Sequence, residues 1–233
     1  MRLFLFDVDG TLVTARGAGR RAVTRALVSV FGTAGPIERY EFSGKTDPQI
    51  VSELMGAAGL GSEAIAARLP AFYARYLKVL DAEIGDGTRV AVMPGIKELI
   101  ERLADHRAAT VGLLTGNIEA GARIKLAPTG LWEYFRVGAY GSDDADRSRL
   151  PAVAARRAEV LVGGPLAPEN VVIIGDTPLD IGCARAFGAV AVAVATGWHR
   201  AEQLAEFEPD LLFSDLSDVP GVLARLLDGG RRR

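Results

Sequence analysis

The feature that most constrains the fold is an apolar run at the N-terminus that ends in two acidic residues. Residues 2–6 read RLFLF, and Asp7, Asp9, Gly10 and Thr11 follow at once. A run rich in Leu and Phe is typical of a buried strand in a parallel sheet. Because side chains alternate along a strand, Asp7 and Asp9 would point the same way and repel each other unless a cation lies between them. The stretch predicts a strand that carries a hard-metal site at its end, although an acidic loop after a core strand would need no metal.

Composition narrows the class of protein. The chain has 233 residues, 49% of them hydrophobic, and a net charge of -2, which gives no electrostatic reason to expect nucleic acid or an anionic membrane as partner. We therefore expect small molecules as partners. No apolar stretch approaches the roughly 20 residues of a membrane span, and a single cysteine allows no internal disulfide, so a reducing cytoplasm is the expected location.

Two parts of the chain differ in their pattern of hydrophobic residues. Residues 15–87 show helical periodicity and predict three or four helices, one of which starts at Asp47-Pro48 with Asp47 as the N-cap. From residue 93 onward, strands and helices alternate, which predicts a parallel sheet with helices on both faces. The expected elements are helix 95–103, strand 108–114, helix 118–126, strand 135–140, helix 150–162, strand 171–174, helix 179–187, strands 190–194 and 211–213, and a last helix ending near 227.

Polar residues follow three of the expected strands. Asp7 and Asp9 follow the first, and Gly175-Asp176 with Asp180 four residues later follows the strand at 171–174. In open parallel sheets the ligand site lies beyond the carboxyl ends of the strands. Four carboxylates there exceed what a buried site tolerates without a metal, and oxygen ligands favour Mg²⁺ over zinc.

The third polar strand end is the stretch Thr115-Gly116-Asn117. A hydroxyl and an amide at a helix start, together with free backbone N–H groups, favour an anion. Lys125 lies on the same helix, and side chains lean toward the helix N-terminus. Lys125 can therefore extend back toward the strand ends, although a solvated lysine is the ordinary alternative.

Together these motifs resemble the haloacid dehalogenase (HAD) superfamily, and within it the phosphoglycolate-phosphatase type. Its first motif, Asp-x-Asp-Gly-Thr, is matched by residues 7–11, its second by Thr115, and its fourth, Gly-Asp-x-x-x-Asp, by residues 175–180. The resemblance implies a Rossmann-like α/β core at residues 1–15 and 88–233. It also implies an inserted α-helical cap domain at residues 16–87 that sets substrate specificity.

The resemblance implies two-step phosphoryl transfer. Asp7 would attack phosphorus to give an aspartyl-phosphate, and Asp9 would protonate the leaving alkoxide and then take a proton from the hydrolysing water. Mg²⁺ would be held by Asp7, the backbone carbonyl of Asp9, and Asp176, while Asp180 would contact a ligand of the metal or a water bound to it.

The other expected site residues hold the substrate. Thr115, Lys125 and backbone amides near Gly10 and Thr11 would bind phosphoryl oxygens, beside Gly116 and Asn117. In many relatives a lysine follows the third strand, but residues 141–151 contain none. Lys125 is the preferred substitute, because some members take this lysine from the helix after the second motif, and Arg149 is the alternative.

Substrate and assembly stay open at this stage. Lys45, in a loop resembling the family's substrate-facing cap loop, could bind an anionic end of the substrate, or the loop could be no more than a turn before a helix. The expected substrate is a small phosphorylated metabolite, with phosphoglycolate suggested by the resemblance alone. A sugar phosphomutase is the main alternative, ahead of a dehalogenase or a silent phosphate-binding protein. The protein would be a monomer or a homodimer.

Overall fold

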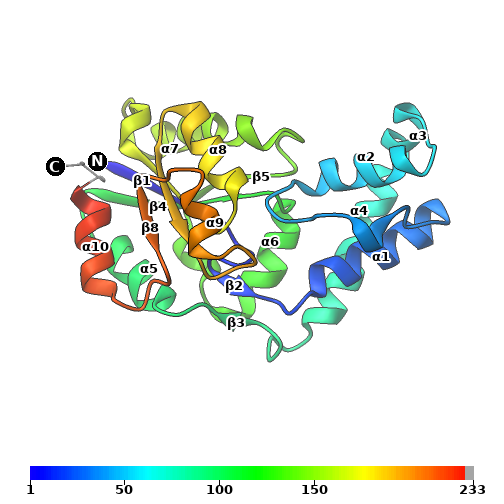
Figure 1. Cartoon of the computed structure of the whole chain (residues 1–233), viewed down its shortest axis with the longest axis horizontal. Coiled ribbons are helices and arrows are strands. Elements are labelled where there is room, and N and C mark those ends of the chain that lie inside the picture. Colours follow the sequence, from blue (N-terminus) through cyan, green and yellow to red (C-terminus); the bar gives the residue numbers. More distant parts are fainter. Residues whose placement is uncertain (229–233) are drawn as a thin grey trace.

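The computed structural model describes residues 1–228 and consists of a parallel sheet with a helical unit beside it (Figure 1). The sheet has the strand order β5-β4-β1-β6-β7-β8, and every neighbouring pair is parallel. Its strands are β1 (Arg2–Phe6), β4 (Ala109–Thr115), β5 (Val137–Tyr140), β6 (Val171–Gly175), β7 (Val190–Val194) and β8 (Leu211–Phe213). This order confirms the expected α/β fold class.

Helices cover both faces of this sheet. They are α5 (Ile96–Ala104), α6 (Glu119–Leu126), α7 (Leu150–Val162), α8 (Pro178–Phe187), α9 (Ala201–Ala205) and α10 (Val219–Asp228). Side chains of β1 alternate between two cores: Phe4 and Phe6 pack with α5 and α10, whereas Leu3 and Leu5 pack with α7 and α8. A strand buried on both faces reads as a continuous apolar run, which is why the N-terminal stretch was recognisable.

The helical unit has its own core. It contains α1 (Ala18–Phe31), α2 (Asp47–Ala57), α3 (Ser62–Ala66) and α4 (Leu69–Ile84), which gather at the end of the molecule opposite the termini (Figure 1). Phe72 and Tyr76 of α4 are fully buried there against α1 and α2, with their rings stacked 5.9 Å apart. A separate apolar core is typical of a separately folding unit, and the expected domain limits stay a prediction.

Two short strands mark where the chain leaves the sheet and returns to it. β2 (Val13–Thr14) pairs antiparallel with β3 (Ala91–Val92), so the two crossings lie side by side. Neither strand was expected from the sequence, because two residues are too few to show a period. In the described part of the chain, the helices are too short or too polar to cross a membrane.

One helix start differs from its prediction. Thr46, not Asp47, is the N-cap of α2, because the Thr46 hydroxyl accepts a hydrogen bond from Gln49 N at 3.2 Å. Asp47 is the first helical residue, and its carboxylate instead accepts a hydrogen bond from Ile118 N at 2.8 Å. The Asp47 carboxylate thus bonds Ile118, which is distant in the sequence, and does not form the local capping bond that its sequence position suggests.

Candidate active site

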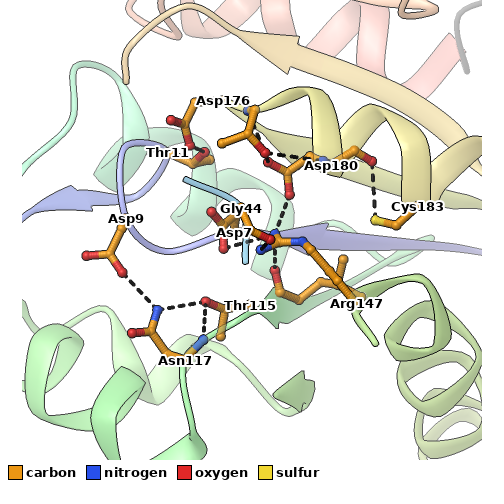
Figure 2. A network of polar contacts seen from close by, with 12 residues as sticks. Asp7, Asp9, Thr11, Gly44, Thr115, Asn117, Arg147, Asp176, Asp180 and Cys183 are labelled. Atoms are coloured by element: carbon orange, nitrogen blue, oxygen red, sulfur yellow. Dashed lines mark hydrogen bonds and ion pairs between the residues drawn. The ribbon is translucent and has the colours of Figure 1, made fainter. Parts of the chain in front are cut away.

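The carboxyl ends of three adjacent strands bring the predicted site residues together. β1 lies between β4 and β6. Thr115 is the last residue of β4, Asp7 follows β1 and Asp176 follows β6. All three are buried, and Figure 2 shows Asp7 between Asp176 and Thr115. The register of the sheet therefore collects residues that are up to 169 positions apart in the chain.

Three carboxylates form a cluster in this crevice. Asp7, Asp176 and Asp180 each offer an oxygen, and these oxygens lie within 4.8 Å of one another. The pKa of Asp7 is raised from 3.8 to about 6, chiefly because the carboxyl is buried; Arg147 lowers this pKa, whereas the neighbouring Asp180 and Asp9 raise it. Burial, followed by Asp7 and Asp180, holds the pKa of Asp176 well above its usual range. A buried set of oxygen donors with excess negative charge fits a hard divalent cation.

Gly10 and Thr11 fix the position of Asp176. Thr11 donates its hydroxyl to Asp176 Oδ1 at 3.0 Å and is fully buried. Gly10 has a φ of 88°, and a Cβ there would lie 2.4 Å from Asp176 Oδ2. Only glycine fits both the backbone conformation and the contact. The side chain of Thr11 is thus directed at an acid of the cluster.

Asp180 is held by the start of its own helix. Thr177 caps α8, and Asp180 Oδ2 accepts hydrogen bonds from the Thr177 N–H at 3.1 Å and from the Thr177 hydroxyl at 2.7 Å. Asp180 Oδ1 is paired with Arg147. Both carboxylate oxygens of Asp180 therefore have partners within the protein, and its expected indirect role at a metal stays a prediction.

Arg147 is a residue that the sequence analysis missed. Its Nη2 lies 3.2 Å from Asp7 Oδ1 and also bonds Asp180, and its side chain is only 6% exposed. The alternative proposed from sequence, Arg149, is 70% exposed and lies 3.6 Å from Asp144 and Asp146. Residues 147–149 form a single 3-10 turn, and that turn directs Arg147 inward. The sequence shows two arginines, Arg147 and Arg149, after the third strand of the core. It does not indicate which of them points into the crevice.

Lys125 lies on the other side of the crevice, beside Asp9. Its Nζ donates to Asp9 Oδ2 at 2.5 Å and to Asn117 Oδ1 at 2.7 Å. Asn117 Nδ2 also donates to Asp9 Oδ2, at 2.8 Å, and to the Thr115 hydroxyl at 2.8 Å. Lys125 is thus buried against Asp9, whereas Arg147 is the cation that contacts Asp7. The Asp9 side chain is 45% exposed and points toward Asn117, apart from the acid cluster (Figure 2).

Lys45 has partners of its own. Its Nζ lies 2.6 Å from Glu53 Oε2 and 4.4 Å from the centre of the Tyr40 ring. Gly116 lies directly beneath this loop, because a Cβ at Gly116 would lie 2.1 Å from the Lys45 carbonyl. The charge of Lys45 is therefore neutralised within the helical unit, and its predicted role in substrate binding is not required by this geometry.

A cleft of about 820 Å³ opens above these groups. Its walls come from both units: Asp7, Asp9 and Lys125 from the sheet side, and Lys45 and Tyr76 from the helical unit. Trp198, in the loop after β7, lines the cleft and is 90% exposed. An exposed tryptophan leaves a large apolar face in water, which makes Trp198 a candidate contact for a ligand that the sequence analysis did not identify.

Residues 1–188 match the family model of the haloacid dehalogenase-like hydrolases. The chain belongs to this hydrolase family, as the motifs at the strand ends predicted. Curated relatives include a phosphoglycolate phosphatase of Synechococcus elongatus, 26% identical over 97% of this chain and 99% of the relative. Another, from Cereibacter sphaeroides, is 29% identical over 96% of this chain and 98% of the relative. Family and relatives confirm the predicted enzyme class, a HAD-type phosphatase.

Solved structures share the fold. A hydrolase from Pseudomonas syringae has a TM-score of 0.73 at 20% identity and covers 97% of this chain and 99% of its own. A chain described as a beta-phosphoglucomutase, from Bacteroides vulgatus, has a TM-score of 0.69 at 19% identity, covering 100% of this chain and 91% of its own. At such identities the likeness extends to the fold alone.

Proposed function

We propose that this protein is a Mg²⁺-dependent phosphatase that hydrolyses a small phosphate monoester through an aspartyl-phosphate on Asp7. The observation that carries the proposal is that the acids lie in two separate places. Asp7 lies in a buried cluster with Asp176 and Asp180, while Asp9 is directed away from the cluster by Asn117 and Lys125. A nucleophile beside a cation site and a separate proton carrier are the parts that this reaction needs.

The proposed reaction has two steps, the formation of the aspartyl-phosphate and its hydrolysis. Asp7 attacks phosphorus and the bond to the leaving oxygen breaks, while Asp9 gives that oxygen its proton. Asp9 then takes a proton from the water that cleaves the aspartyl-phosphate. Lys125 and Asn117 hold the Asp9 carboxylate at hydrogen-bond distance. Thr115 and the backbone amides near Gly10 and Gly116 are proposed to bind phosphoryl oxygens.

The proposed ligands for Mg²⁺ are Asp7, the backbone carbonyl of Asp9, and Asp176, with Asp180 in support. When bound, the cation neutralises phosphoryl charge and that of the crowded acids. Arg147 is proposed to supply the cationic contact to Asp7 that the family's third-motif lysine supplies. Two features support this role: its contacts to Asp7 and Asp180 and its burial.

Residues 16–87 are proposed to act as the cap domain that selects the substrate. Phosphoglycolate is the first candidate because relatives bear that name. A cleft of about 820 Å³ lies within the range that accommodates drug-sized ligands, so larger esters belong in the same test. A cytoplasmic location, partners limited to small metabolites and a monomeric or homodimeric state remain parts of the proposal.

The test is a panel of phosphate monoesters assayed with Mg²⁺ and after chelation by EDTA. We expect hydrolysis of at least one small ester and its loss on chelation, restored by added Mg²⁺. The main alternative, a sugar phosphomutase, is kept because the beta-phosphoglucomutase neighbour shares the fold. A mutase would require a hexose 1,6-bisphosphate and release little phosphate. No turnover of any ester, p-nitrophenyl phosphate included, would favour a silent phosphate-binding protein.

A further inference from the structure

A loop of the helical unit reaches into the crevice of the sheet. We call residues 43–47 the cap loop. Asp47 N donates to Gly116 O at 2.7 Å, and the Asp47 carboxylate accepts from Ile118 N. The Thr46 hydroxyl donates to Ala145 O at 2.7 Å. The cap loop is thus hydrogen-bonded to the segment that follows β4 and to the segment that follows β5.

Arg147 adds a contact of a different kind, because the same guanidinium bonds the cap loop and the proposed nucleophile. Its Nη1 donates to Gly44 O at 2.9 Å. Its Nη2 lies 3.2 Å from Asp7 Oδ1 and also bonds Asp180. Figure 2 shows Gly44, Asp7 and Asp180 around this one side chain. One rigid group therefore contacts both the cap loop and the proposed nucleophile.

Gly44 is shaped for this close approach. Its φ is 74°, and a Cβ there would lie 2.6 Å from Thr177 Oγ1 and 2.9 Å from Leu179 Cβ. A side chain at Gly44 would strain the backbone and push the loop off the sheet. The Gly44 carbonyl reaches Arg147 only while the loop is seated in this way.

The chemistry of arginine matters here. A guanidinium is a planar fork whose two terminal nitrogens donate in different directions, whereas the ammonium of a lysine is one compact donor centre. A lysine at position 147 keeps a positive charge for Asp7 and Asp180 but cannot span the carboxylates and the Gly44 carbonyl together.

We propose that Arg147 is a positioning residue for the cap loop: by bonding Gly44 O and Asp7 at once, it holds this loop against the proposed nucleophile. This goes beyond a neutralising charge, because it assigns closure of the cleft to a group at its base. It rests on the contacts and not on turnover, and its main readout is independent of the phosphatase proposal.

The experiment is hydrogen exchange of the full chain, followed in peptides that cover residues 42–50, with Arg147→Lys and Gly44→Ala as the variants. The matched control is Arg157→Lys, because Arg157 bonds Asp143 and the Gly138 carbonyl in the same fashion away from the cleft. We expect exchange of the Asp47 amide to rise by about tenfold in both variants, the scale of losing one hydrogen bond to a charged group. Hydrogen exchange in peptides of α4 should stay at the wild-type rate in both variants. In the Arg157→Lys protein, residues 42–50 should also exchange at the wild-type rate.

Kinetics give a second readout. If the enzyme turns over an ester, Arg147→Lys should raise KM more than it lowers kcat, because the charge at Asp7 is kept and the loop is loosened. Wild-type exchange at residues 42–50 in a folded Arg147→Lys protein would overturn the proposal, as would equal acceleration in α4, which would indicate general destabilisation. Should Arg147→Lys not fold, Gly44→Ala decides, and unchanged exchange there overturns the proposal.

Discussion

The ammonium of Lys125 lies 2.5 Å from the carboxylate of Asp9, although the two residues are 116 positions apart in the chain. Asn117 bonds both of them, so the three side chains form a closed set. Lys125 is 3% exposed, and a lysine buried to this degree is held by its partners. The pairing assigns Lys125 to the orientation of the proposed proton carrier.

Lys125→Met should therefore slow turnover by misplacing Asp9. We expect kcat to fall by about 10²-fold, the scale of losing effective general acid–base catalysis, with a smaller change in KM. Steady-state kinetics at several pH values is the measurement. Lys97→Met, on an exposed face of α5, is the control and should match the wild type. An unchanged kcat in Lys125→Met would remove this role.

Asp7→Asn should abolish hydrolysis while the protein still folds. A neutral amide cannot attack phosphorus, and we expect kcat to fall by at least ~10³-fold. Removing one negative charge from a buried cluster relieves repulsion, so the melting temperature without metal should be equal or higher. Asp105→Asn, at an exposed position, should behave as wild type. Near-wild-type hydrolysis by Asp7→Asn would sink the assignment of the nucleophile.

The metal-free protein should lose stability as the pH rises. The pKa of Asp7 is about 6 in the folded protein against 3.8 ordinarily, so between these values the folded state binds more protons than the unfolded state. The contribution of Asp7 to the free energy of unfolding is therefore largest below about pH 4. It decreases as the pH rises and is lost above about pH 6. Mg²⁺ that binds the ionised cluster should raise the melting temperature more at pH 7.5 than at pH 5. Thermal melts with EDTA or Mg²⁺ measure this, and an equal effect at both pH values would contradict it.

Lys45 offers a paired test with Glu53. If Lys45 binds an anionic end of the substrate, Lys45→Ala should raise KM for a carboxylated ester such as phosphoglycolate and leave an uncharged leaving group unaffected. Glu53→Gln frees Lys45 from its 2.6 Å ion pair and should lower the same KM. If both variants match the wild type across the ester panel, the loop is structural and the role predicted from sequence is wrong.

Trp198→Ala should change substrate preference. Because Trp198 is 90% exposed in the wall of the cleft, we expect KM for p-nitrophenyl phosphate to rise about 2- to 12-fold, the range for losing one aromatic pair. Phosphoglycolate, which has no aromatic face, should be unaffected. Trp132→Phe, at a partly buried residue packed on the sheet, is the control. Equal effects on both esters would argue against an aromatic contact.

The strand ends were predictable because they depend on local patterns. An apolar run followed by Asp7-Val-Asp9 is readable without a structure, and so is Gly175-Asp-x-x-x-Asp180. That these segments would meet followed from a general rule for parallel sheets. Helix 150–162 and strand 190–194 were predicted at their observed bounds, since strong periodicity and a short apolar run defined them.

Which individual side chains of distant segments contact each other was not predictable in this way. The sequence analysis gave the role of the third-motif lysine to Lys125 or Arg149, and it did not predict that Arg147 would be the cation in contact with Asp7. Asp47 fitted a local capping pattern, yet a partner 71 positions away drew its carboxylate to the sheet.

The amino-acid sequence by itself determined the fold class, the family and the acids of the site, because hydrophobic period and motif spacing are properties of neighbouring residues. Only the tertiary structure decided which cation contacts which acid. An ion pair depends on where two side chains end in space, and at Arg147 a single 3-10 turn settled it, placing one arginine in the crevice and leaving Arg149 in solvent.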